Sequence, residues 1–568
     1  MNFADHDPAL RPLLDRLLAP ADRARVEPLL AELGRVAAED VDPLAATADR
    51  NPPVLRSFSP AGDRIDQVEF HPAYRELAEV AFRRFGLAAM SHRPGVNGWP
   101  GRTPHVVKYA LSYLFVQAEF GLACPLSMTD SAARVLRLFD ERRYAAEIDR
   151  LTSTDPAIAA TGAMFMTEVD GGTDLARTAT EATEHGDRWT LRGRKWFASN
   201  VSADYVLTLA KVPGQGSGTR GLGMFLLPRL RPDGTRNAIR IDRLKDKLGA
   251  RSMASGEVTL EDAVAWPVGD LARGVPQMLE MVNVSRLSNA MRSAALMRRA
   301  VREAVLHTRS RVVFGDALFD QPLMRATLLP LLLDAEAALG LVLESAAQLD
   351  RADTGDEPAR ALVRVLTPLA KHSICKRARQ VTGEAMEIRG GNGYVEDWVD
   401  PRLLRDAHLG SIWEGSSNVI ALDVLRCLRK EHAHHRLAEY YGDRVRSLQH
   451  AESAAAAAEL AERWAGARDV GDRLVTAADA DGQAGIGRYA EDLAGLLMST
   501  LLLEHADALL HRGSGHRELL LAHAHLRRLV DPRAVPAPAL AHLDALAEGG
   551  AVPADAAAAV LDGGLTHA

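Results

Sequence analysis

Apolar residues recur at three- and four-residue spacing along the first part of the chain, a pattern that predicts helices. The clearest segments are 23–40, 74–90 and 105–120. Two stretches rich in Pro and Gly, 51–72 and 98–101, interrupt them and are predicted to be connections. We therefore expect residues 1–157 to form an N-terminal helical domain.

The pattern changes near Thr161 to short β-branched and apolar runs with turn signals between them. Segments 179–184 and 188–193 flank His185-Gly186-Asp187, which predicts a hairpin. Further strands are predicted at 205–212, 222–227 and 257–260. Short strands at this spacing are typical of a small β-barrel or sandwich, so residues 158–275 are predicted to be a middle β-domain.

Helical periodicity returns and continues through long amphipathic segments at 286–311, 321–350 and 357–387. Long helices joined by short loops favour a bundle, predicted here over residues 276–430. Residues 431–568 are Ala-rich and are predicted to be a helical extension. The predicted fold class is therefore α+β, with helices before and after a β-domain.

Composition places the chain among soluble globular proteins. Its 568 residues exceed what one core organises, and its 47% hydrophobic and 25% charged content is ordinary. The net charge of −7 gives no overall basic footprint for nucleic acid. The extension is more acidic still, with 12 Arg, no Lys and 20 acidic residues, a net charge of −8.

Cysteine usage and the termini bear on location. The cysteines Cys124, Cys375 and Cys427 are far apart, so we expect neither disulfides nor a thiolate metal site. This fits a reducing cytoplasm. The N-terminus lacks a signal-peptide pattern, and apolar runs such as 493–503 are too short to span a bilayer. We expect a cytoplasmic protein that does not bind a membrane.

Candidate chemistry is concentrated at residues 410–418, where Glu414 lies between Trp413 and Gly415 and small polar residues follow. A carboxylate in such surroundings would be partly desolvated, which raises its pKa and makes it a stronger base. The alternative is a glutamate in a helix-capping turn.

A second candidate site combines two segments. Residues 164–174 predict a strand that ends at Thr167 and opens into a Gly-rich turn, whose backbone N–H groups can hold an anion or a polar ring edge. Residues 195–200 place an aromatic pair before small polar residues. An aromatic wall with hydroxyls suits a flat polar heterocycle. The alternative is a polar hairpin turn beside a packed aromatic.

These segments together resemble the acyl-CoA dehydrogenase superfamily. The resemblance rests on segments that occur in the family's order: Met166-Thr167-Glu168 with 171–174, 195–200, 247–251, Arg311-Val312-Val313-Phe314-Gly315, 390–394, Arg405-Asp406-Ala407 and Trp413-Glu414-Gly415-Ser416. It covers roughly residues 70–430.

The resemblance implies an N-terminal helical domain, a middle antiparallel β-barrel or sandwich and a C-terminal four-helix bundle, here with an extra C-terminal helical domain. It also implies FAD between the β-domain and the bundle, in a homotetramer built as a dimer of dimers. Phe197 and Ser199 replace the family's usual Trp and Thr, and Glu387 stands where many members have Gln. The implied FAD contacts are Met166, Thr167, Gly172, Thr173, Phe197, Ser199, Arg311, Phe314, Glu387, Gly390, Gly391, Ser416 and Asn418.

The implied activity is that of an FAD-dependent acyl-CoA dehydrogenase, an oxidoreductase acting on the CH–CH group. Glu414 would remove the α-proton of an acyl thioester, with Arg286 and Thr173 contacting the substrate. Some members place the base just before an Arg on the first bundle helix, where this chain has Ser285. The implied acyl carrier is coenzyme A or a carrier protein, and the implied electron acceptor is an electron-transfer flavoprotein or oxygen.

Within the family the chain resembles the AidB-like (DNA-alkylation-response, isovaleryl-CoA dehydrogenase-like) group, on residues 51–53, 67–74, 124–125 and 228–251. That group is associated with DNA binding through a basic C-terminal region. The acidic extension disfavours DNA here, although Arg527, Arg528 and Arg533 could form a local patch. The alternative function is a DNA-associated protective flavoprotein with vestigial dehydrogenase activity.

The histidines His432, His434 and His435 are interpreted as a solvated helix start with no carboxylate beside them. We therefore predict no metal site.

Overall fold

The computed structural model describes residues 2–186 and 188–561. The chain divides into two compact units, each assembled from separate stretches. One comprises the described parts of Met1–Arg35, His105–Gln117 and Asn289–Ala568, and the other comprises Val36–Pro104 and Ala118–Ser288. We call them the helical unit and the β-unit. The four domain ranges expected from the sequence stay a prediction.

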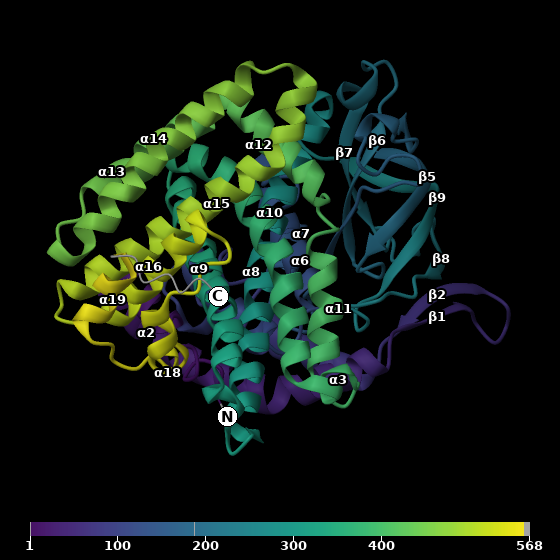
Figure 1. Cartoon of the computed structure of the whole chain (residues 1–568). Helices are drawn as coiled ribbons and strands as arrows, with labels where there is room; N and C mark the ends of the chain where they lie inside the picture. Colours follow the sequence, from purple (N-terminus) through teal and green to yellow (C-terminus); the bar gives the residue numbers. More distant parts are fainter. Residues whose placement is uncertain (1, 187, 562–568) are drawn as a thin grey trace. The chain divides into compact units, whose positions relative to one another are not determined.

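The β-unit contains a seven-stranded sheet that closes on itself (Figure 1). The strands follow the order β3-β6-β4-β5-β9-β7, β7 also pairs with β6, and β8 pairs with β9. Most pairs are antiparallel, but β6 runs parallel to β3 and β4. This closed path agrees with the predicted small β-domain. The strands are β3 (Gly162–Phe165), β4 (Glu181–His185), β5 (Arg188–Ser199), β6 (Tyr205–Lys211), β7 (Leu222–Pro228), β8 (Ile239–Leu244) and β9 (Ser255–Pro267).

Apolar side chains that alternate along these strands fill the interior of the sheet. Leu191, Val258 and Leu260 are almost fully buried, and the rings of Trp189 and Phe225 lie 5.5 Å apart. The predicted β4–β5 hairpin is confirmed by pairing from Glu181–Arg192 to His185–Arg188, while Asp187 of its turn lies outside the described residues.

Residues 51–72 are not the plain connection that their Pro and Gly content predicted. They contain the hairpin β1 (Val54–Phe58) and β2 (Arg64–Glu69). Leu55 pairs with Val68, and both pack against the core of the sheet. Packing with the β-unit therefore outweighs the local loop signal. The other regular elements of this unit are α3 (Asp42–Arg50), α4 (Pro72–Ala78), α6 (Ala123–Asp140), α7 (Ala145–Leu151), two π-helical turns (Ala37–Val41 and Glu79–Arg84) and the start of α8 (Gly274–Ser310).

The helical unit is built around long helices packed on one another, as the sequence predicted. Helix α9 packs against α10, α5 and α15, and α10 also packs against α11 and α12. A short hairpin, β10 (Val312–Val313) and β11 (Asp316–Ala317), precedes α9. The helices are α1 (Leu10–Leu17), α2 (Pro20–Val36, which ends in the β-unit), α5 (His105–Val116), α9 (Pro322–Asp353), α10 (Glu357–Ile388), α11 (Asp400–Gly410), α12 (Ser417–Glu431), α13 (Ala433–Arg446), α14 (Ala454–Thr476), α15 (Asp479–Leu510), α16 (His516–Val530), α17 (Ala537–Ala541), α18 (Leu543–Glu548) and α19 (Ala554–Leu561).

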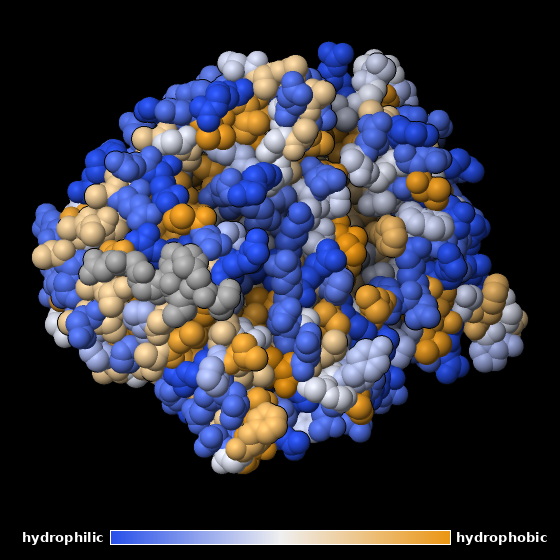
Figure 2. All heavy atoms as spheres, viewed as in Figure 1, coloured by the Kyte–Doolittle hydropathy of each residue, from blue (hydrophilic) through white to orange (hydrophobic). Residues whose placement is uncertain are grey.

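Two of these helices, α9 and α15, are long and apolar enough to cross a membrane by length and composition alone. Their most apolar windows are 78% and 83% buried in the structure, so we interpret them as core helices. On the face shown in Figure 2, hydrophilic and hydrophobic residues are interspersed, in keeping with a mean hydropathy of −0.10.

Buried ion pairs tie the extension to the long helices. Glu336 on α9 accepts hydrogen bonds from Arg298 at 3.2 Å and from Arg517 of α16 at 2.6 Å. Glu344, further along α9, accepts a hydrogen bond from Arg444 of α13 at 2.6 Å. Burial alone would raise the pKa of Glu336, but Arg517 and Arg298 outweigh it and hold that pKa below its usual range. The extension is thus part of the core of the helical unit.

Candidate active site

Glu414 occupies a strained turn between α11 and α12. Its φ is +57°, in the left-handed region that residues with a Cβ rarely adopt, and Gly415 follows at +97°. Such a backbone costs on the order of 1–3 kcal/mol and persists only where its surroundings impose it. The side chain of Glu414 is half-buried. The neighbours of the turn therefore determine where this carboxylate lies.

Hydrogen bonds hold the turn on both sides of the glutamate. Trp413 donates its indole N–H to Oδ1 of Asn289 at 2.8 Å, and Lys371 donates to the carbonyl of Gly415. Asn289 is fully buried and also donates to the carbonyl of Gly410 at 2.8 Å. A carboxylate fixed in this way needs little reorganisation before it reacts.

One face of α8 supports this arrangement. Asn289, Arg292 and Ser293 share that face because they are spaced i, i+3 and i+4. The guanidinium of Arg292 lies 4.7 Å from the centre of the Trp413 ring. A Cβ at Gly410 would lie 2.8 Å from Oγ of Ser293, so the approach of α11 to α8 leaves little room for a larger residue. Asn289 and Lys371 received no role from the sequence, because no local pattern links them to the turn.

The alternative base position holds a serine that is 0% exposed. The Ser285 hydroxyl has no hydrogen-bond partner among the described residues. A neutral hydroxyl with no neighbouring base cannot take up a proton as a carboxylate does. Arg286, the predicted substrate contact, follows it on α8 and is also buried.

The β-unit holds the second candidate site at the end of β3. The backbone N–H of Trp196 donates to the carbonyl of Thr167 at 2.8 Å, which places Thr167 beside the aromatic pair of β5. A Cβ at Gly172 would meet only the Thr167 methyl group, at 3.7 Å, so the Gly-rich turn also lies next to Thr167. The Phe197 side chain is 54% exposed. An exposed aromatic ring on β5, with Thr167 and an open glycine at the neighbouring strand end, fits the flat heterocycle that the sequence predicts.

A buried ion pair joins these two segments. Lys195, 0% exposed, donates to Oε1 of Glu168 at 2.7 Å and to the carbonyl of Leu209 at 3.0 Å. Glu168 also accepts from the Thr180 hydroxyl at 2.5 Å and from the Ala179 N–H at 2.6 Å. Burial raises the pKa of Glu168, but Lys195 outweighs it and the net pKa is lowered. Both residues belong to the segments that carried the family resemblance, but sequence reasoning gave neither a role.

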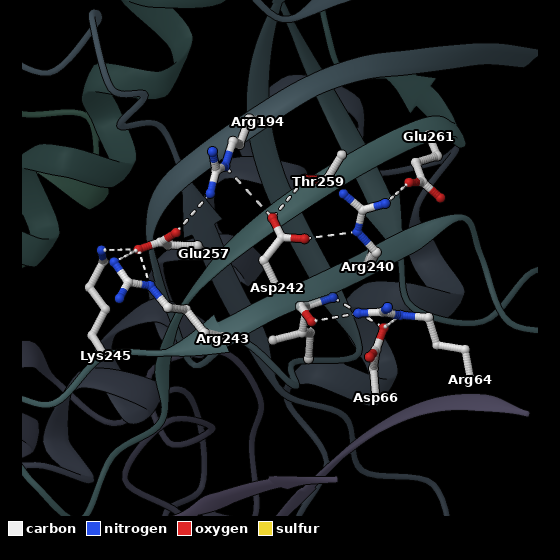
Figure 3. Close-up of polar contacts among 11 residues, drawn as sticks. Arg64, Asp66, Arg194, Arg240, Asp242, Arg243, Lys245, Glu257, Thr259 and Glu261 are labelled. Carbon is white, nitrogen blue, oxygen red and sulfur yellow. Dashed lines mark hydrogen bonds and ion pairs between the residues drawn. The ribbon is translucent and has the colours of Figure 1, made fainter. Parts of the chain in front are cut away.

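Charged residues on β5, β8 and β9 form ion pairs across the strands (Figure 3). Glu257 is buried and accepts hydrogen bonds from Arg243 at 2.7 Å, Lys245 at 2.8 Å and Arg194 at 2.9 Å. The hydrogen bond from Arg243 is the main cause that lowers the pKa of Glu257 to about 2. Lys245 also lies 3.8 Å from the centre of the Trp196 ring. The ammonium of Lys245, held by Glu257, therefore makes cation–π contacts with the aromatic pair.

The hairpin of β10 and β11 presents an exposed aromatic ring. Its two turn residues, Phe314 and Gly315, have φ angles of +54° and +100°, as a two-residue type I′ turn requires. The Phe314 side chain is 97% exposed, and Arg311 just before the hairpin is exposed as well. These are the two residues predicted to meet the FAD of a neighbouring subunit.

The remaining predicted contacts lie at accessible positions. Ser416 precedes α12, where its side chain makes no capping hydrogen bond. A Cβ at Gly391 would meet nothing within 4 Å, so this backbone is open to close approach. The exposed members are Thr173 in the β-unit and Glu387, Gly390, Gly391, Ser416 and Asn418 in the helical unit, while Met166 and Ser199 are half-buried.

The structure places six of the predicted residues in two sets. Glu414, Ser416 and Asn418 share one short segment of the helical unit, and Thr167, Gly172 and Phe197 share one edge of the β-unit. Each set lies within one unit, and the individual FAD and substrate contacts stay predictions.

Comparison with family models covers most of the chain. Residues 272–429 match the model described as "Acyl-CoA dehydrogenase, C-terminal domain" and residues 163–263 match "Acyl-CoA dehydrogenase, middle domain". Residues 1–155 match "Adaptive response protein AidB N-terminal domain".

Comparison with characterised sequences and solved structures gives the same pattern. "Putative acyl-CoA dehydrogenase AidB" of Escherichia coli (strain K12) is 39% identical over 68% of this chain and 71% of its own length. "Acyl-CoA dehydrogenase family member 11" of Caenorhabditis elegans is 35% identical over 74% of this chain and 69% of its own length. The structure titled "Bd2924 apo-form" has a TM-score of 0.80 at 31% identity over 89% of this chain and 98% of that one. The structure of Caenorhabditis elegans ACDH-11 in complex with C11-CoA has a TM-score of 0.78 at 29% identity, over 89% and 87% of the two chains.

Proposed function

This chain belongs to the acyl-CoA dehydrogenase family, and from that premise we propose that it desaturates an acyl thioester between Cα and Cβ with Glu414 as the base. Membership makes the chain an oxidoreductase that acts on acyl-CoA and uses FAD, and the AidB-like relation is shown by its N-terminal match. The base assignment and the electron acceptor are proposals.

The held turn at Glu414 is the observation that carries the proposal. A left-handed backbone at a non-glycine residue, fixed by Trp413 on one side and Lys371 on the other, sets the position of one carboxylate. Structural glutamates on helix surfaces need no such arrangement. Strain of this kind is concentrated at functional sites.

The residues fit the following division of labour. Bound FAD supplies a two-electron acceptor for the hydride that leaves Cβ. Glu414 takes the α-proton onto its carboxylate, which needs an approach within hydrogen-bond reach of Cα. Thr167, Gly172 and Phe197 would hold the flavin ring system. Gly391 would let the protein backbone come close to the adenosine diphosphate part of FAD. An electron-transfer flavoprotein would accept the electrons after turnover.

The test is anaerobic bleaching of the flavin absorbance by a panel of acyl-CoAs that includes C11-CoA. We expect wild type to bleach with at least one of them and Glu414→Gln to react at least about 100-fold more slowly, the usual contribution of a positioned base. Flavin content should be unchanged in the variant. Glu439→Gln, an exposed glutamate on α13, is the matched control and should react as wild type does.

A bleaching rate within a few-fold of wild type in Glu414→Gln would remove the base assignment. The alternative, a DNA-associated protective flavoprotein with vestigial activity, is favoured by the AidB-type N-terminal match. It predicts a DNA mobility shift at a stated salt concentration and no bleaching by any thioester.

The basic cluster that could support DNA binding is partly engaged within the chain. Arg528 donates to Asp334 at 3.3 Å, and Arg527 donates to the carbonyl of Leu561 at 2.7 Å. Arg533 is exposed. Since affinity for DNA depends on cations that neutralise phosphates, this arrangement and the acidic extension support the dehydrogenase proposal.

A further inference from the structure

Two histidines and one aspartate converge where α13 packs against α14. His434 and His435 lie in the first turn of α13, and Asp472 lies near the end of α14. The two helices pack side by side (Figure 1). Oδ1 of Asp472 is 3.1 Å from Nε2 of His434 and 2.7 Å from Nε2 of His435. The three ligand-capable atoms all lie within 4.8 Å of one another.

The expectation that no carboxylate accompanies this histidine tract is therefore wrong. Asp472 is 38 residues from His434 and 37 from His435 in the sequence, and only the pairing of the two helices brings it there. A third histidine, His432, lies close by, with its ring centre 6.5 Å from that of His434 and 6.3 Å from that of His435.

We propose that His434, His435 and Asp472 bind one divalent transition-metal ion, with Zn²⁺ as the reference ion. Imidazole nitrogen and carboxylate oxygen are ligands that Zn²⁺ takes, at about 2.0–2.2 Å. In a tetrahedral site such bonds place neighbouring ligand atoms about 3.3 Å apart. The Asp472–His434 distance of 3.1 Å would have to open by about 0.2 Å, and the Asp472–His435 distance of 2.7 Å by about 0.6 Å, to admit the ion. His435 and Asp472 are exposed and can move by that much, and water would complete the coordination.

One side of the site is already fixed by packing. His434 is 1% exposed, and a Cβ at Gly471 would lie 2.5 Å from Cδ2 of its ring. The same Cβ would lie 2.7 Å from the hydroxyl of Tyr489. Glycine inside a helix costs about 1 kcal/mol relative to alanine, so Gly471 is explained by the ring that it accommodates.

The packing also settles which ring nitrogen is presented. Nδ1 of His434 has no hydrogen-bond partner among the described residues, so the ring is oriented by Gly471 and by its Nε2 contact with Asp472. The fixed ring cuts the ordering cost of binding, and the ion would clamp α13 to α14.

The experiment uses tag-free, FAD-loaded full-length chain, treated with EDTA and desalted, and titrated with ZnCl₂ by calorimetry. CoCl₂ in a parallel titration reports ligand geometry through its visible absorption. We expect one ion per chain in the wild type. His435→Ala and Asp472→Asn should each weaken binding by at least 10- to 100-fold, the loss that even an outer-shell partner causes. Both side chains are exposed, so both variants should remain folded.

Two further variants separate the site from surface histidines in general. His511 is exposed, 5.4 Å from the ring of His450 and 3.4 Å from a carboxylate oxygen of Asp507, and His511→Ala should leave binding unchanged. Gly471→Ala keeps all three ligands but displaces the His434 ring, so it should weaken binding and change the Co²⁺ spectrum. The proposal fails if wild type binds neither ion, if His435→Ala and Asp472→Asn bind as wild type does, or if His511→Ala loses binding equally.

Discussion

The buried pair of Lys195 and Glu168 allows a quantitative test of what holds the candidate flavin edge. Lys195→Met removes the ammonium but keeps a long side chain in a fully buried position. Among the described residues, the Glu168 carboxylate would then have no oppositely charged hydrogen-bond partner. It would keep the Thr180 hydroxyl and the Ala179 N–H as donors.

The expected cost follows from these contacts. Removing one partner of a buried pair costs about 3–5 kcal/mol. Because Glu168 keeps donors and Met restores apolar packing, we expect about 3 kcal/mol, the lower end of that range. The reverse change, Glu168→Gln, leaves Lys195 with the Leu209 carbonyl as its recorded partner and should cost at least as much. The double variant should cost about 2 kcal/mol less than the sum of the two single variants, since neither charge is then left alone.

Hydrogen exchange of the FAD-loaded protein measures this change where it occurs. At about 1.4 kcal/mol for each tenfold change, a loss of about 3 kcal/mol should speed exchange in peptides from β5 and β6 about 100-fold. Peptides from α15, in the other unit, should exchange as in wild type. Arg192→Met is the matched control, because Arg192 lies on the same strand and pairs with Asp262 at the exposed surface.

Two results would refute this reasoning. Exchange in β5 and β6 that is unchanged in Lys195→Met would show that the pair does not stabilise the edge. Equal acceleration in Arg192→Met would show that any loss of charge on β5 has the same effect, and burial would not be the cause.

Two other predictions test the neighbouring parts of the site. The folded pKa of Glu257, about 2, lies below its ordinary 4.5, so its ion pairs stabilise the fold above pH 4.5 and this stabilisation is lost as the pH falls toward 2. Glu257→Gln should therefore lower the melting temperature at pH 7, and the melting temperature of the variant should fall less than that of wild type between pH 4.5 and pH 2. An equal fall in both proteins would contradict this. Trp413→Phe removes the 2.8 Å hydrogen bond to Asn289, which leaves a buried acceptor unpaired at a cost of about 1–3 kcal/mol. Flavin reduction by the substrate should slow about tenfold or more, while the flavin content should not change. An unaltered rate would show that this hydrogen bond does not position Glu414.

Features set by neighbouring residues could be predicted from the sequence, and features set by distant ones could not. The β4–β5 hairpin follows from a Gly-containing turn between alternating strands. The residues beside Glu414 led to its prediction as the base, which stays a prediction. The β1–β2 hairpin was missed because Leu55 and Val68 gain their packing from the core of the sheet, while the local sequence indicates a loop. Asp472 was missed beside the histidines because its partners are 37 and 38 residues away.

The roles of Lys195 and Asn289 could not be predicted either, because their partners are also distant in the sequence. Lys195 and Glu168 are 27 residues apart, and Asn289 and Trp413 are 124 apart. No periodicity connects such pairs. A match to a family's segments marks these residues or their neighbours, but only the folded chain shows that they act as supports for Thr167 and Glu414.

Helix α12 has a chemically distinct group at each end. It begins at Ser417, directly after the turn of Glu414, and its 15 residues span about 22 Å. It stops at His432, whose φ of +50° breaks the helix and starts α13. A tilt of 5° at the histidine end would move the other end by about 2 Å over that length. A shift at the junction of α12 and α13 would therefore be passed along the helix to the Glu414 turn, which Asn289 and Lys371 hold in place.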